Sequence, residues 1–192
     1  MSSNAIRHAA PANPANAAVA TAQVFSLASN PLLACAIGVP GKLALESKRF
    51  SVRAEGNAQV AAGATTANIT LLGALALPTA PLTAANWTVI KAGTAAAIAT
   101  LACPWWMQAD LIFDSLSGLV HGTFGQLMAN TITATAAVGG VLTGVNGTNL
   151  PQVQAGPVTI QPADPVFYLA VAATFSVGAG SVANLANFEI GF

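Results

Sequence analysis

The sequence predicts an all-β fold: a two-sheet antiparallel β-sandwich of jelly-roll type with an extended N-terminal arm. From Lys48 onward, apolar and polar residues alternate in short runs, which is the pattern of strands with one buried face. Glycine and proline interrupt these runs at short intervals, and no long capped stretch has the period of a helix. About seven or eight such strands fit into residues 48–192, and this number suits two packed sheets.

Residues 1–47 are expected to form the arm, and residues 48–192 the sandwich domain. The arm is rich in Ala, Asn and Pro at first and then turns apolar in VFSLASNPLLACAIGVPGKLAL. This second part is too apolar for disordered filler, so we expect it to dock onto another surface. Deletion of residues 1–40 should then leave a folded domain that no longer binds its partner. The residues expected to contact a partner or an adjacent subunit are Val24, Phe25, Leu27, Leu32 and Leu33.

Each expected strand of the domain has its own alternating run. Phe50 and Val52 alternate with polar residues in RFSVRAEG, and Ile69 does so in TTANITLL. NWTVIKAG, VFYLAVAATFSVG and NFEIGF are further strands, whereas residues 131–157 alternate weakly and are expected to be loops with one or two short strands. The expected sandwich core comprises Phe50, Val52, Trp105, Met107, Leu111, Phe113, Phe167, Leu169, Val171 and Phe175.

The segment CPWWMQADLIFDSLSGLVHGTFG combines aromatic, acidic and histidine residues. As a strand it turns one face to the core and places Asp110 and Asp114 on the other face. These two carboxylates are about 13 Å apart in a regular strand, beyond the roughly 5 to 9.5 Å of glycosidase pairs. His121 follows a turn and could approach Asp114, with Ser115 beside it, but no G-x-S-x-G elbow or oxyanion loop accompanies them. We therefore expect no catalytic residues and no enzyme activity.

The histidines and cysteines predict no metal site. His8 and His121 lie far apart in the chain, and Cys35 and Cys103 form no CxxC pair, so we expect two buried free thiols. GAGSVA contains G-x-G-x-x-A, but only residues 184–192 follow it, which is too few for a dinucleotide-binding unit. We expect no metal and no cofactor.

The chain is unusually poor in charge. Only 6% of its 192 residues are charged, with six basic and six acidic side chains, whereas about 25% is usual for soluble domains. A free monomer keeps itself soluble with a mixed charged surface, so a chain this poor in charge is expected to cover much of its outside. The sequence contains no run of basic residues that could bind along a phosphate backbone, so nucleic acid is not an expected partner.

The apolar runs do not predict a membrane-spanning helix. The best run, LLGALALP, stops at Pro78, short of the roughly 18 residues that a span requires. Proline and asparagine interrupt the first 41 residues, so we expect no secretory signal and no membrane partner. Two alternatives stay open: LLAC, which ends at Cys35, resembles a lipoprotein signal, and Phe188, Ile190 and Phe192 resemble the last strand of a bacterial outer-membrane β-barrel.

Three segments carry a family resemblance: KRFSVRAEGNAQVAAGATTANITLL, WWMQADLIFDSLSGLVHGTFGQ and FYLAVAATFSVGAGSVANLANFEIGF. In strand pattern and turn placement, residues 48–192 resemble the jelly-roll decoration, or cement, proteins of tailed bacteriophages. The resemblance implies a homotrimer that is made in the host cytoplasm and binds the major capsid protein on the outer surface of the virion. There it would stabilise the capsid lattice against packaged DNA, without catalytic residues. The high alanine content and the length of the arm depart from this pattern.

A further alternative is a phage tail or fibre module that binds host glycans. Such a module predicts exposed aromatic residues on loops. All three tryptophans of this chain fall within or beside strand patterns instead.

Overall fold

The computed structural model describes residues 5–8, 22–27, 29–40, 49–59, 65–93, 95–97, 103–114, 119–135, 139–146, 154–156, 166–177 and 180–191, with some side chains in these ranges left undescribed. In this part of the chain the only helical segment is a short 3-10 turn, η1 (Ala84–Asn86). The paired strands are antiparallel throughout the same ranges. The expected all-β, antiparallel fold is confirmed.

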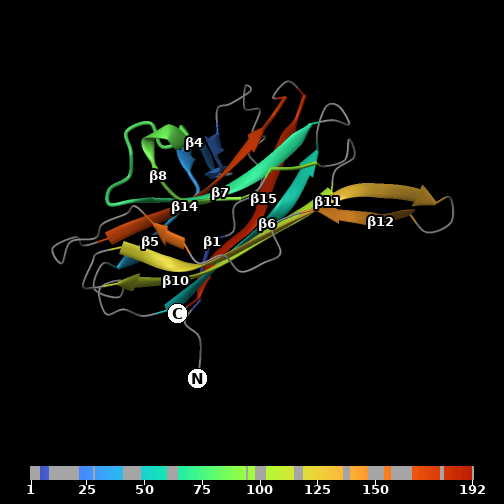
Figure 1. Ribbon diagram of the computed structural model, residues 1–192. Helices are drawn as coiled ribbons and strands as arrows, with labels where there is room; N and C mark the ends of the chain where they lie inside the picture. Colours follow the sequence, from blue (N-terminus) through green and yellow to red (C-terminus); the bar gives the residue numbers. More distant parts are fainter. Residues whose placement is uncertain are drawn as a thin grey trace.

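The larger sheet contains seven strands. Its order is β1 (Ala5–His8), β15 (Val182–Gly191), β6 (Arg49–Gln59), β10 (Cys103–Asp114), β11 (Leu119–Thr135) and β12 (Gly139–Asn146), with β13 (Gln154–Gly156) also paired to β11. The first half of β11 pairs with β10 and its second half with β12. Figure 1 shows β11 and β12 as a ribbon that projects beyond the packed sheets. Residues 131–157 therefore hold more strand than their weak alternation predicts.

The smaller sheet contains six strands. Its order is β2 (Gln23–Val24), β14 (Val166–Phe175), β7 (Thr66–Ala74) and β8 (Thr88–Ala92), with β5 (Ala36–Pro40) also on β14 and β9 (Ala96–Ala97) also on β7. Two further strands, β3 (Ser26–Leu27) and β4 (Asn30–Ala34), pair only with each other.

The chain passes repeatedly between the two sheets, and two of these passages form one paired unit. β6 of the larger sheet is followed by β7 of the smaller sheet, and β14 of the smaller sheet is followed by β15 of the larger one. β6 pairs with β15 while β7 pairs with β14. These four strands thus form a double-stranded ribbon that is folded over a common core (Figure 1).

The core lies between the two sheets and follows the alternation of the sequence. The side chain of one expected core residue, Phe113, lies outside the described part. The other nine are buried in one cluster: Phe50, Val52, Trp105, Met107, Leu111, Phe167, Leu169, Val171 and Phe175. The Trp105 indole donates a hydrogen bond from Nε1 to the backbone oxygen of Asn184 at 3.2 Å. Gly56 lies opposite Trp105, where a Cβ atom would collide with the Asn184 backbone and approach the indole ring.

The N-terminal segment from residue 22 to residue 40 is part of the sandwich. β2 and β5 both pair with β14, and the ring of Phe25 stacks on Trp105 with centroids 5.8 Å apart and planes 14° apart. Phe25, Cys35, Ile37 and Val39 belong to the main core cluster. We had expected residues 1–47 to form an arm outside the domain, but residues 22–40 belong to the domain. The reason is that their apolar side chains pack into the core while their backbone pairs with the edge of β14.

Substitution of Phe25 should therefore destabilise the domain itself. The side chain is fully buried against Trp105, so we expect Phe25→Ala to lower the free energy of unfolding by about 3 to 5 kcal/mol. Urea denaturation followed by far-ultraviolet circular dichroism would measure this change.

Leu32→Ala is the matched control, because Leu32 lies in the same segment and is 77% exposed. We expect this control to change the free energy of unfolding by less than about 0.5 kcal/mol. Equal effects of the two substitutions would contradict the placement of Phe25 in the core.

The structure also changes the expectation for the deletion of residues 1–40. This deletion removes β2, β5 and the four side chains of the main core cluster named above, so it should unfold the domain.

Candidate functional site

The acidic residue at the centre of β10 is paired with an arginine. Asp110 accepts a hydrogen bond from the Arg49 guanidinium on β6 at 3.1 Å, and the pair lies on the outer face of the larger sheet. With the Arg49 side chain 68% exposed, this ion pair contributes less than about 1 kcal/mol to stability. Arg49 was not among the residues predicted from the sequence, because the register between β6 and β10 is not visible in either strand alone.

The strand register does not place His121 opposite Asp114. The backbone of His121 lies opposite Ile112, and that of Asp114 lies opposite Leu119. The side chains of Asp114 and His121, and the whole of Ser115, lie outside the described residues. The structure therefore brings Asp110 to Arg49, and the arrangement of the Asp114, Ser115 and His121 side chains lies outside its described part.

Cys35 is buried and protonated. Burial raises the pKa of its thiol to about 12, whereas the thiolate is the form that attacks electrophiles and binds metals.

Within the described ranges, histidine, cysteine, aspartate and glutamate form no group of three that could hold a metal ion. No helix in these ranges is long and apolar enough to cross a membrane. The side chain of Cys103 lies outside the described part.

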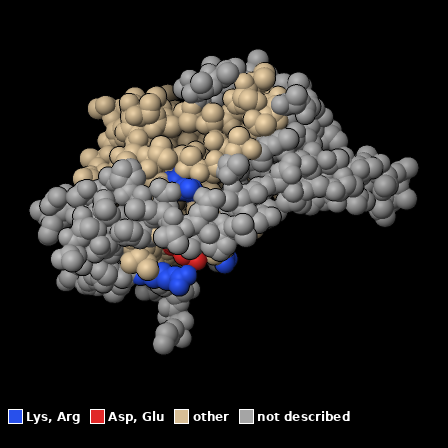
Figure 2. Space-filling view, viewed as in Figure 1, with Lys and Arg blue, Asp and Glu red and all other residues tan. Residues whose placement is uncertain are grey.

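The charged side chains are concentrated on one face of the sandwich. Of the charged side chains that the structure describes, those on the larger sheet are Arg49, Arg53, Glu55, Asp110 and Glu189, and the strand alternation turns them away from the core. The smaller sheet carries Lys91 as its described charge. In Figure 2 the acidic groups lie toward the bottom of the view beside basic groups, whereas the broad described area toward the top is tan, with a basic group at its lower margin.

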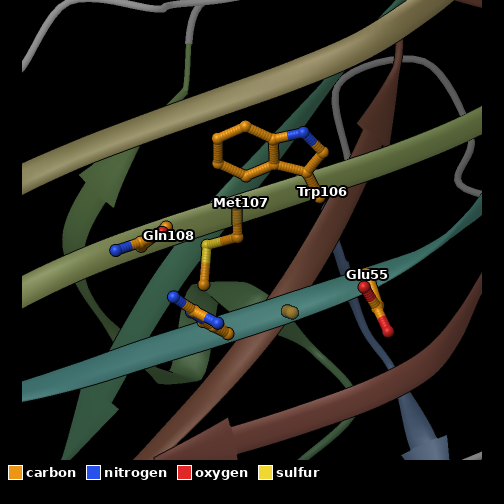
Figure 3. Close-up of a pocket in the computed structure, with 6 residues that line it drawn as sticks. Glu55, Trp106, Met107 and Gln108 are labelled. Carbon is orange, nitrogen blue, oxygen red and sulfur yellow. The ribbon is translucent and has the colours of Figure 1, made fainter.

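A small hollow lies on the charged face. Trp106 and Gln108 of β10 line it together with Arg53 and Glu55 of β6, while Ala54 and Met107 also contribute to its wall. Its volume is about 190 Å³, less than the roughly 300 to 1,000 Å³ of pockets that enclose drug-sized ligands. Figure 3 shows Trp106 and Glu55 on neighbouring strands at this hollow. The hollow is therefore suited to a small group rather than to a large cofactor.

An additional layer covers the outer face of the smaller sheet. The segment between β7 and β8 folds over β14, where Trp87 and Ala84 pack with Val24, Ala34 and Leu72 in a second buried cluster. Hydrogen bonds fix this layer: the Trp87 indole donates to the Pro81 oxygen at 2.8 Å, and the Val24 backbone donates to the Leu82 oxygen at 3.0 Å. Strands β7 and β14 are consequently buried on both faces.

The outside of this layer is apolar and carries exposed large side chains. We call it the uncharged face and define it by Leu32, Leu33, Leu75, Leu77 and Val89, all of which are at least 40% exposed. Leu32 and Leu33 lie on β4, whose last residue, Ala34, packs into the second cluster. The elements that contribute to the second cluster, or that adjoin it in the chain, thus present leucines and a valine to their surroundings.

The structure divides the five residues expected to contact a partner into two groups. Val24 and Phe25 are fully buried inside the domain, and Leu27 packs against the main core. Leu32 is 77% exposed and Leu33 is 49% exposed. Leu32 and Leu33 are therefore the most accessible of the five, whereas Val24 and Phe25 lie inside the domain and Leu27 is only partly exposed.

No protein-family description matches this chain, and no curated protein matches it.

The buried state of Cys35 makes a prediction about its reactivity. Because its thiol stays protonated, we expect iodoacetamide to leave Cys35 unmodified in the folded protein as the pH rises through the ordinary cysteine pKa of about 8.5. Mass spectrometry of the digested protein would locate the modification.

The same protein unfolded in urea serves as the control and should be alkylated at Cys35. Rapid alkylation of Cys35 without unfolding would instead show that the thiol is accessible and would contradict its burial.

The raised pKa of Cys35 also implies a contribution to the stability of the fold. This contribution is complete below about pH 8.5 and is lost progressively as the pH rises toward 12.

Proposed function

We propose that this protein is a structural virion protein that binds the outer surface of a bacteriophage capsid and stabilises the lattice of major capsid proteins. It acts as a homotrimer, without a cofactor or catalytic residues, and its sandwich is wound as a jelly roll. The folded-over ribbon of β6, β7, β14 and β15 supports this winding.

The uncharged face is the observation that carries the proposal. It presents five large apolar side chains on elements whose described charge is Lys91 alone. Exposed apolar area of this kind on a folded domain marks a contact with another macromolecule. Its burial would contribute on the order of 25 cal/mol per Å² before the costs of association are subtracted.

The capsid and the neighbouring subunits of the trimer are the proposed occupants of this face. A permanent assembly covers the apolar surface that a free monomer would have to mask with charge, which accounts for the 6% charged residues of the chain. The native mass of the purified protein, measured with and without added capsids, would test the trimer and the lattice contact together.

Substitution of the two exposed leucines should weaken capsid binding. Each leucine buried at an interface contributes about 1.5 to 3 kcal/mol, so we expect Leu32→Ser combined with Leu33→Ser to reduce the affinity for capsids by about 100-fold or more. Co-sedimentation of the protein with purified capsids would measure it.

Ile112→Ser is the matched control, because Ile112 is also apolar and 42% exposed but lies on the charged face. It should bind capsids as the unmodified protein does. Unchanged binding of the double leucine variant would contradict the assignment of the uncharged face.

Capsid binding should also depend only weakly on salt. The uncharged face offers few charges to be screened, so raising the salt from about 0.05 M to about 0.5 M should change the affinity by less than about threefold. The same co-sedimentation assay would measure this dependence, and a steep loss of binding would show that the contact is electrostatic.

A further inference from the structure

Four side chains form a rectangular array on the outer face of the larger sheet. Glu55 of β6 lies directly opposite Trp106 of β10, and Arg53 lies directly opposite Gln108. Directly opposed residues have Cβ atoms about 4.5 to 5.5 Å apart, and residues two apart along a strand are separated by nearly 7 Å. The hollow of about 190 Å³ lies among these four side chains.

The array combines one exposed aromatic ring with three planar polar groups. Trp106 is 42% exposed, and among the described side chains no other aromatic ring is exposed to this extent. Arg53 supplies only hydrogen-bond donors, Glu55 supplies only acceptors, and Gln108 supplies both. The next residue in the row of Gln108 is Gly125, which adds no side chain.

A sugar ring has the chemistry that matches this array. One face of a pyranose is lined by C–H groups that pack on the electron-rich face of an indole, while its hydroxyl groups both donate and accept hydrogen bonds. The charges of Arg53 and Glu55 offset each other, and a second carboxylate, Glu189 of β15, lies directly opposite Arg53, which favours a neutral sugar over a sulfated or phosphorylated one. The volume of the hollow admits a small ring rather than a large ligand.

A nucleic acid fits the same surface less well. A base could stack on Trp106, but binding of a strand requires a groove of uncompensated positive charge along its phosphates. Arg49 is paired with Asp110 at 3.1 Å, and Arg53 lies beside Glu55 on the same strand face. The described charged face therefore offers no such groove.

We propose that Trp106, Glu55, Arg53 and Gln108 form a binding site for a neutral pyranose unit of a glycan. The two sheets pack against each other through the core, so their outer faces point in opposite directions. The saccharide site thus lies on the side opposite the uncharged face and stays accessible when that face is covered. This site goes beyond the capsid contact and does not depend on it.

The test uses the full chain on an array of neutral hexose and N-acetylhexosamine oligosaccharides. We expect binding to at least one of these glycans, with an affinity reduced about tenfold or more by Trp106→Ala and partly retained by Trp106→Phe. Ile112→Ala is the matched control, because Ile112 lies on the same strand and the same face with the same 42% exposure but outside the hollow. It should bind glycans as the unmodified protein does.

Tryptophan fluorescence provides a second readout. Trp87 and Trp105 are buried, so the emission that acrylamide quenches in the folded protein comes from Trp106, and a bound oligosaccharide should protect it. Absence of binding to every glycan on the array would overturn the proposal, as would full binding by Trp106→Ala or an equal loss in Ile112→Ala. Loss of capsid co-sedimentation in Trp106→Ala, without glycan binding by the unmodified protein, would instead make this face a protein contact.

Discussion

The stacking of Phe25 on Trp105 is the contact on which the rest of the structure depends. It joins the N-terminal segment to β10 of the larger sheet, with ring centroids 5.8 Å apart. Because successive side chains of a strand point to opposite faces, burial of Trp105 also directs Trp106 outward. A shift of one residue in the register of β10 would exchange the two tryptophans and remove both the core contact and the hollow. The packing of the core thereby determines the chemistry of the outer surface.

The two outer faces of the sandwich have different physical characters. The larger sheet displays polar and charged side chains, with the Arg49–Asp110 ion pair among them. The smaller sheet is covered by a layer in which Trp87 is buried and leucines point outward. This separation of charge explains how a chain with few charged residues can keep one side hydrated while the other side is available for a large apolar contact.

The alternation of the sequence predicted the strands that have one buried face. Phe50 and Val52 of β6 and Trp105 and Met107 of β10 point inward as the period of two requires. The role of residues 22–40 was not predicted, because β2 and β3 have two residues each and their pattern carries no period. Their partner β14 is also distant in the sequence, so the pairing that fixes them is not visible locally.

The candidate sites were predicted less well than the core, for a similar reason. The register of β10 against β6 brings Arg49 to Asp110 and Glu55 to Trp106, and this register follows from packing between the sheets. The period of two that turns Trp105 inward also places Trp106 on the polar face. Gln108 shares that face of β10 by the same period of two, whereas Arg53 and Glu55 of β6 became neighbours of Trp106 only when the two strands were placed side by side.

The position of β14 between the N-terminal strands and β7 constrains the order in which the protein can fold. β2, β5 and β7 all pair with a strand that begins at Val166, so the smaller sheet cannot be completed until the ribosome has made most of the chain. Contacts between such distant segments slow folding and leave apolar strands exposed during synthesis. The low charge of the chain adds little repulsion between growing copies, and efficient production in the cell then depends on rapid closure of the sandwich once β14 and β15 emerge.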